Sequence, residues 1–204
     1  MRFYRPLDHI LGAKSKVAVL RHLVQDDREQ SGREIARAVG LSPKPLNQVL
    51  ARLADEGMLL RRNIGRVYLF RLNRNNRLVA ELVVPLFEGE EELLNQALTK
   101  VLEGVPSVLS AILYGSVSRR EEKPYSDVDL LVVTEDGTKA VEEMLEDRAM
   151  GFMRRYGNFL SFIVMSLAEF RQEYQERNDF LHEVLRTGRV VIGQLPLELV
   201  YGSD

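Results

Sequence analysis

Residues 108–133 read VLSAILYGSVSRREEKPYSDVDLLVV, and this stretch decides the fold of the C-terminal half. Its first seven residues form an apolar, β-prone run that ends abruptly at Gly115-Ser116. A second run of this kind begins at Asp127, with a further acid at Asp129. Side chains two apart on a strand share a face, so the two carboxylates project side by side. The stretch therefore predicts two strands joined by a glycine turn and a polar loop.

Paired carboxylates of this kind can hold one or two hard divalent cations through oxygen, and Mg²⁺ is the natural candidate. Such metals bridge the phosphates of a nucleoside triphosphate and neutralise charge as the α-phosphorus is attacked. Gly115 would let the backbone approach those phosphates, and the Ser116 hydroxyl and nearby amides could hydrogen-bond them. Each piece alone is common, since Gly-Ser marks many turns and an Asp-x-Asp pair is often solvated. Their combination at this spacing favours a metal–nucleotide site.

The string LYGSVSRREEKPYSDVDLLVV (113–133) resembles the signature of the DNA polymerase β-like nucleotidyltransferase superfamily, especially its minimal nucleotidyltransferases. The resemblance covers roughly residues 105–193 and implies a mixed sheet flanked by helices, Mg²⁺, and transfer of a nucleotidyl group from a nucleoside triphosphate, with ATP expected. It implies catalytic roles for Ser116, Asp127 and Asp129, with metal ions held by the two aspartates. It also implies nucleotide binding by Gly115, Ser116, Arg119 and Ser126.

The chain departs from that signature at two positions. Arg120 stands where the family commonly has glycine after the arginine. Active members also supply a third carboxylate from a later strand, and in NFLSFIVMSLAEF (158–170) the residue that aligns with it is Ser161, which cannot replace a carboxylate as a ligand or base. Three other acids could reach the site instead: Glu146, Asp147 and Glu169. Of these, Glu169 is better explained as part of a capping box with Ser166.

The N-terminal half carries the signals of three helices. Apolar residues recur at helical spacing over 7–24, and Ser31-Gly32-Arg33-Glu34 is a capping box before a short second helix that Gly40 ends. A third helix is predicted over 42–57, opened by Ser42-Pro43 and closed by Gly57. Pro45 disfavours helical geometry at the preceding residue, so the regular helix is expected to begin one or two residues late.

Two short strand-like runs follow, Met58–Leu60 and Val67–Phe70, and Gly65 favours a hairpin turn between them. The arrangement over residues 31–73 resembles winged helix-turn-helix regulators. That resemblance implies duplex DNA as a partner, with the third helix in the major groove and a basic wing beside it. The alternative is a winged helix used only for dimerisation or interdomain packing. The expected DNA-contacting residues are Lys44, Asn47, Gln48, Arg52, Arg61, Arg62 and Arg66.

The formal charge of −2 conceals an asymmetry between the halves. Residues 1–77 carry 16 Lys and Arg against 7 Asp and Glu, a net of +9, and the rest carries 12 against 23, a net of −11. The basic half suits nucleic acid, although it could also be solubilising surface or dock the acidic half. The absence of cysteine excludes disulfides and thiolate zinc sites, and the three histidines lack metal-type spacing. No apolar run approaches a membrane span, so a cytoplasmic location is expected.

Together these patterns predict an α+β chain with an N-terminal winged helix-turn-helix domain over 1–76, a helical connector over 77–104 and a nucleotidyltransferase-type domain over 105–204. Pro85 interrupts the connector pattern, so two helices or one kinked helix should bridge the domains, and its apolar stripe could serve a homodimer.

Three functions remain open from the sequence. The first is an enzyme that transfers an AMP-like group to a hydroxyl acceptor. The second is a transcriptional regulator whose degenerate transferase domain binds only a nucleotide or a partner, which Ser161 favours. The third, implied by the resemblance alone, is an antitoxin beside a small helical toxin partner.

Overall fold

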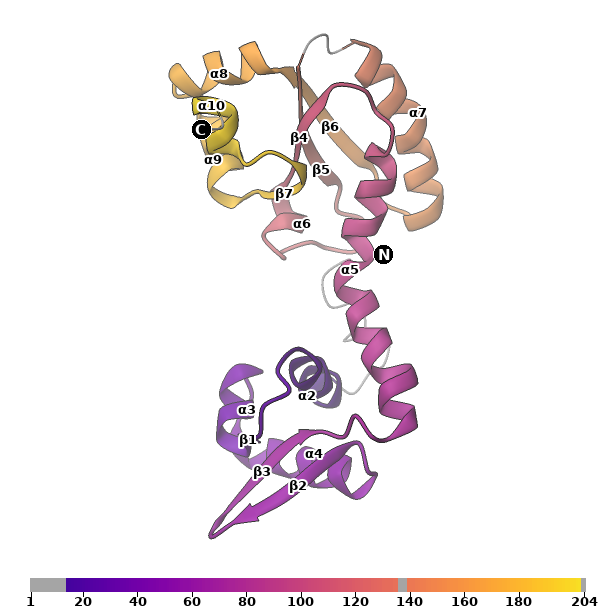
Figure 1. Ribbon diagram of the computed structural model, residues 1–204, viewed down its shortest axis with the longest axis vertical. Coiled ribbons are helices and arrows are strands. Elements are labelled where there is room, and N and C mark those ends of the chain that lie inside the picture. The colour runs from indigo at the N-terminus through magenta and orange to yellow at the C-terminus, as the bar shows by residue number, and fades with distance from the viewer. Residues whose placement is uncertain (1–13, 136–138, 203–204) are drawn as a thin grey trace. The chain divides into compact units, whose positions relative to one another are not determined.

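The computed structural model describes residues 14–135 and 139–202 (Figure 1). The chain divides into two compact units, with the boundary between Glu92 and Leu93 inside a long helix. Each unit has its own hydrophobic core, and each combines helices with a small sheet. The predicted α+β class is confirmed. None of the helices in the described part of the chain is long and apolar enough to span a bilayer.

Three helices form most of the N-terminal unit: α2 (Lys14–Gln25), α3 (Gly32–Ala38) and α4 (Pro43–Asp55). The start of the first predicted helix, residues 7–13, lies outside the described residues. The predicted capping box is present, because the Glu34 amide donates to the Ser31 hydroxyl (3.3 Å) and the Ser31 amide donates to the Glu34 carboxylate (2.7 Å). Local side-chain chemistry therefore sets where α3 begins.

The start of α4 differs from the prediction. The helix begins at Pro43 itself, with Lys44 and Pro45 in its first turn, and not one or two residues later. Lys44 is helical although the Pro45 ring restricts it, because the first amides of a helix have no intrahelical acceptor and Pro45 therefore removes no hydrogen bond at this position. The buried leucines Leu46, Leu50 and Leu53 then face the core of the unit.

The winged hairpin consists of β2 (Leu59–Ile64) and β3 (Val67–Leu72), and β1 (Gln30–Ser31) pairs with the other edge of β3. All three strands are antiparallel. Ile64 pairs with Val67, so Gly65 and Arg66 form a two-residue turn, and the φ of +62° at Gly65 is one that glycine adopts without strain. The predicted hairpin and its turn are confirmed.

A single helical segment with one irregularity follows the hairpin. A π-helical turn, η1 (Val79–Val83), leads directly into α5 (Val84–Leu102). The Val84 amide donates to the Val79 carbonyl, five residues back, at the point where Pro85 lacks an amide. A wider turn keeps the pyrrolidine ring from clashing with the preceding carbonyls, which explains the irregularity. The break predicted at Pro85 thus takes the form of a π-turn.

The C-terminal unit is built on a four-stranded sheet with the order β6-β5-β4-β7. The strands are β4 (Val108–Tyr114), β5 (Val128–Thr134), β6 (Leu160–Ser166) and β7 (Arg189–Gly193). The β5–β6 pair is parallel and the other two pairs are antiparallel, so the sheet is mixed as predicted.

Helices cover both faces of this sheet (Figure 1). The end of α5 and α7 (Lys139–Tyr156) pack against one face, with Val128, Leu130 and Val132 of β5. On the other face, Leu131 and Val133 lie under α8 (Leu167–Gln175), α9 (Asp179–Thr187) and α10 (Pro196–Tyr201). Because side chains alternate along a strand, Asp129 belongs to this second face.

Candidate functional site

A glycine joins β4 to the short helix α6 (Gly115–Ser118). Gly115 has a φ of +73°, which glycine tolerates and other residues rarely adopt. A Cβ at this position would lie 2.2 Å from Oδ2 of Asp129, far inside van der Waals contact. The register explains this proximity, since Tyr114 pairs with Asp129 across the two strands. Only glycine lets the turn lie against this carboxylate.

Two carboxylates stand at the start of β5. Asp127 is exposed immediately before the strand, and Asp129 is half-buried within it. Burial raises the pKa of Asp129, the negative charge of Asp127 raises it further, and the positive charge of Arg119 opposes the shift. Burial and the charge of Asp129 also raise the pKa of Tyr114 to about 12. Two carboxylates that repel each other in a partly desolvated place are a donor set that a hard cation would stabilise.

A polar loop holds these groups in place. The Ser126 hydroxyl accepts from the Lys123 amide (2.9 Å), and the side-chain amide of buried Asn158 donates to the Ser126 carbonyl (2.9 Å). Ser126 therefore shapes the turn before Asp127. Arg119 donates to Glu121 (3.0 Å) and to Glu183 of α9 (3.3 Å). Its guanidinium is thus held by two acids while remaining close enough to influence Asp129.

Ser161 of β6 is the register partner of Asp129. Partners in a parallel pair direct their side chains to the same face, so the exposed Ser161 side chain lies beside the Asp129 carboxylate where a third acid would serve. Among residues 14–135 and 139–202, no three His, Asp or Glu side chains gather closely enough to share a metal. The chain therefore brings two acids together at this site and places a serine next to them.

The other candidate acids lie elsewhere. Glu146 and Asp147 are exposed on α7, which covers the opposite face of the sheet. Glu169 accepts from the Ser166 amide (2.8 Å) and hydroxyl (2.8 Å), and these hydrogen bonds lower its pKa. The capping-box explanation of Glu169 is confirmed.

The residue after Arg119 adopts a glycine-like conformation. Arg120 has a φ of +61°, in the left-handed region that glycine favours. Arg120 therefore holds this left-handed geometry at a cost of about 1–2 kcal/mol in backbone energy.

Two residues of this site carry no signal in the sequence. Asn158 is a single polar residue before a strand, and Glu183 is one acid on an amphipathic helix. Both are brought to the site by tertiary contacts from 32 and 64 residues away, respectively. Neither spacing nor residue type indicates such contacts.

The N-terminal unit presents a separate polar surface. All seven predicted DNA-contacting residues are exposed, four on α4 and three on the hairpin or its turn. Asn47 lies against Gly32, where an added Cβ would approach its amide oxygen to 2.3 Å. Arg61 lies over the Tyr68 ring, with 5.2 Å from its guanidinium carbon to the ring centroid. Arg62 forms a bidentate ion pair with Glu29, so part of its charge is already balanced.

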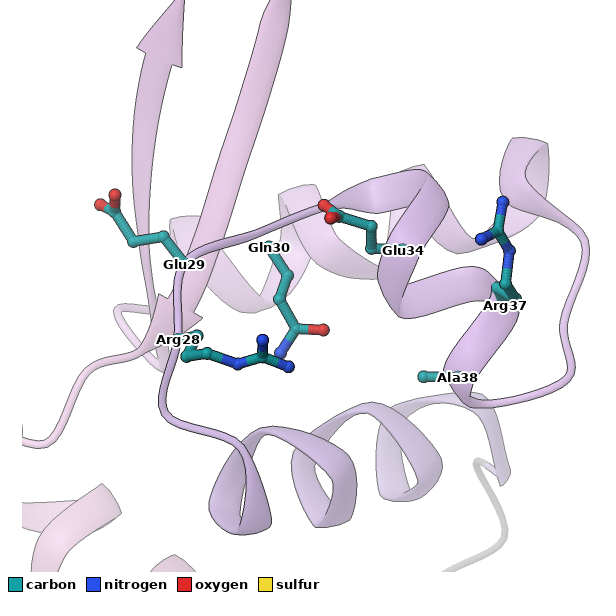
Figure 2. Close-up of a pocket in the computed structure, with 6 residues that line it drawn as sticks. All are labelled: Arg28, Glu29, Gln30, Glu34, Arg37 and Ala38. Atoms are coloured by element: carbon teal, nitrogen blue, oxygen red, sulfur yellow. The ribbon is translucent and has the colours of Figure 1, made fainter.

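A shallow cavity of about 310 Å³ lies beside α3, as Figure 2 shows. Three of its four charged lining residues are engaged with the protein itself: Arg28 pairs with Asp26, Glu29 pairs with Arg62, and Glu34 forms the capping box. The remaining lining residues are Gln30, Arg37 and Ala38. Most of the charge around the cavity is therefore balanced within the protein.

Comparison with known families agrees with both halves of this description. Residues 96–194 match the model of the polymerase beta nucleotidyltransferase family, and residues 14–59 match a winged helix-turn-helix DNA-binding family. A search of curated proteins found no match. The chain is a fusion of a winged helix-turn-helix domain with a nucleotidyltransferase domain of the polymerase beta type.

Proposed function

We propose that the C-terminal domain binds a magnesium–nucleoside triphosphate and transfers its nucleotidyl group, AMP from ATP in the first instance, to a hydroxyl acceptor. The N-terminal domain binds duplex DNA and thereby locates or regulates this activity. One observation carries the proposal: Gly115 lies directly against the carboxylate of Asp129, with Asp127 two residues before it. A turn without side-chain bulk beside two oxygen ligands is what nucleotidyl transfer requires.

Each residue of the site has a distinct task in this proposal. Asp127 and Asp129 would hold magnesium, which neutralises phosphate charge and favours departure of pyrophosphate. Gly115 exposes backbone to the phosphates, and the Ser116 hydroxyl donates a hydrogen bond to a phosphate oxygen. Arg119 contributes positive charge near the same oxygens, while Ser126 keeps Asp127 at the start of β5.

In this proposal, deprotonation of the acceptor hydroxyl is the step for which the site offers the least. A serine hydroxyl at the Ser161 position is neither a strong metal ligand nor a general base at neutral pH. General-base assistance is typically worth about 10²–10⁴-fold in rate. We therefore expect transfer to be slow.

The serine beside Asp129, at position 161, favours a second candidate function. A domain that binds nucleotide through Gly115, Ser116 and two aspartates, but lacks a third acid beside Asp129, can serve as a nucleotide sensor. In that case the protein is a transcriptional regulator whose DNA binding responds to nucleotide.

Labelled-nucleotide transfer tests the enzyme proposal. The purified full chain is incubated with Mg²⁺, α-phosphate-labelled ATP and a cell extract, and labelled acceptors are sought. We expect label with the wild type and with Asp147→Asn, whose acid lies on the opposite face of the sheet, and none with Asp129→Asn. Equal labelling by all three would refute the site. Nucleotide binding without labelling would favour the sensor.

A further inference from the structure

The guanidinium of Arg119 is held from two directions. Its Nε donates to the Glu121 carboxylate (3.0 Å), and its Nη1 donates to the Glu183 carboxylate (3.3 Å). Glu121 lies two residues after Arg119, whereas Glu183 lies on α9, 64 residues away in the sequence. Because the guanidinium is planar, two acceptors at different nitrogens fix its orientation, whereas a single one would let it pivot.

Neither acid occupies the whole fork of Arg119. Other exposed arginines give both Nε and Nη2 to a single carboxylate, and these are Arg28, Arg62 and Arg77. In Arg119 each acid takes one nitrogen, and no described residue accepts a hydrogen bond from Nη2. The guanidinium is therefore oriented and still keeps a donor for an anionic oxygen, as phosphate binding requires.

The loop after α6 fixes the first of the two acids, Glu121. The Arg119 amide donates to the Gly115 carbonyl (3.2 Å), and the Glu121 amide donates to the Ser116 carbonyl (2.9 Å). Between them, Arg120 adopts its left-handed conformation. The chain thus folds back on the turn that begins α6, and the Glu121 backbone is bound to that turn.

The packing of α9 on β4 and α6 fixes the second acid, Glu183. Phe180, Glu183 and Thr187 lie at i, i+3 and i+7, so they share one face of the helix. The Phe180 ring meets the Tyr114 ring edge-on, with 5.3 Å between centroids. The Ser118 hydroxyl donates to the Thr187 carbonyl (2.9 Å). Contacts on both sides of Glu183 therefore hold its carboxylate beside Arg119.

Arg119 also lies near the acidic pair. Its positive charge opposes the rise in the pKa of Asp129 that burial and Asp127 cause. A triphosphate bridged by magnesium to Asp127 and Asp129 would bring anionic oxygens to the same place. The free Nη2 donor of Arg119 is thus positioned beside the site of the phosphates.

We propose that Glu183 is a positioning residue for nucleotide binding, which holds the Arg119 guanidinium so that Nη2 meets a phosphate oxygen of the magnesium–nucleotide. This role rests on the proposed function of the C-terminal domain. Glu183 does not touch the nucleotide and acts only through Arg119. Its side chain is 58% exposed, and exposed ion pairs contribute little to stability, so its loss should change binding and not folding.

Calorimetric titration of the full chain with ATP in the presence of Mg²⁺ tests this role. We expect Glu183→Ala to lower the affinity by about threefold to tenfold, because Arg119 keeps its charge and loses its orientation. Glu183→Gln loses the same charge but keeps an oxygen that accepts from Nη1, so its affinity should stay within about twofold of the wild type. Glu146→Ala removes an exposed acid of α7, on the other face of the sheet, and is the control that should leave the affinity unchanged.

A double-variant cycle tests whether Glu183 acts through Arg119. Arg119→Ala should by itself lower the affinity by about tenfold or more, since it removes a charge-assisted hydrogen bond to phosphate. In this background Glu183→Ala should have no further effect, whereas a general structural role would lower the affinity by the same factor in both backgrounds. Thermal unfolding establishes that each variant is folded.

Several results would overturn the role of Glu183 while leaving the proposed function intact. They are an unchanged affinity of Glu183→Ala, equal losses in Glu183→Ala and Glu183→Gln, and equal losses with and without Arg119. A higher affinity of Glu183→Ala would also overturn it, since Glu183 would then compete with phosphate for Arg119. A wild type that binds no magnesium–ATP would instead refute the proposed function, and the role of Glu183 with it.

Discussion

Replacing Gly115 by alanine perturbs the backbone and the acidic pair together. The φ of +73° costs a residue with a Cβ about 1–2 kcal/mol relative to glycine. The new Cβ would also lie 2.2 Å from Oδ2 of Asp129, so the carboxylate must rotate away. We therefore expect Gly115→Ala to lower both stability and nucleotide affinity.

Gly104→Ala separates these two effects. Gly104 has a φ of +67° in the same structural unit, and an added Cβ there meets no atom within 4 Å. It should show the backbone cost alone, and each 1 kcal/mol lowers the unfolding temperature of a domain of 60–100 residues by about 4–8 °C. In calorimetric titrations, Gly115→Ala should lose at least tenfold in magnesium–nucleotide affinity, about 1.4 kcal/mol, whereas Gly104→Ala should lose none.

A double variant tests the clash directly. Asp129→Ala removes the carboxylate and leaves only ordinary contact, because Cβ of Asp129 lies 3.4 Å from the point that a Cβ at position 115 would occupy. In this background Gly115→Ala should destabilise the protein no more than Gly104→Ala does. Equal stability and equal affinity of the two single glycine variants would refute the reasoning.

Three further predictions concern Ser161, Asp129 and Arg52. Ser161→Asp should tighten magnesium binding and accelerate transfer, by up to about 10²–10⁴-fold if the new acid acts as a base, and an unchanged rate and affinity would count against a role for this position. Because the pKa of Asp129 is raised, the folded protein binds a proton at this carboxylate more tightly than the unfolded chain does. The contribution of Asp129 to stability therefore falls as the pH rises from the ordinary pKa of 3.8 through the raised pKa. Asp129→Asn should therefore raise the unfolding temperature in metal-free buffer at neutral pH, and a thermal scan across pH that matches the wild type would contradict this. Arg52→Ala should weaken duplex DNA binding and reduce the slope of log affinity against log salt by about one, whereas a salt-independent affinity would favour a packing role for the winged helix.

The sequence predicted the N-terminal fold well because its signals are local. The Ser31–Glu34 capping box and the Gly65 turn each depend on residues within four positions of one another. The error at the start of α4 arose from giving too much weight to the steric restriction that Pro45 places on Lys44, since a first turn accommodates Pro45 without loss of a hydrogen bond. The π-turn before Pro85 was not predicted, because its geometry depends on how the helix continues on both sides.

Only part of the candidate site could be predicted from the sequence. Motif spacing indicated Gly115 and the two aspartates, but the contact between Gly115 and Asp129 depends on the β4–β5 register, with Tyr114 opposite Asp129. Asn158 and Glu183 reach the site through long-range packing that leaves no local pattern. The position of β6 at an edge of the sheet could not be predicted either, because strand order is set by the whole sheet.

Calorimetric titration of the metal–nucleotide complex tests the central claim most directly. The full chain is titrated with ATP in the presence and absence of Mg²⁺, and the same titrations are made with Asp127→Asn, Asp129→Asn and the control Asp147→Asn. We predict magnesium-dependent binding by the wild type and the control, and its loss in both site variants while their circular dichroism spectra stay unchanged. Unchanged magnesium–nucleotide affinity in both folded site variants would contradict the assignment of Asp127 and Asp129.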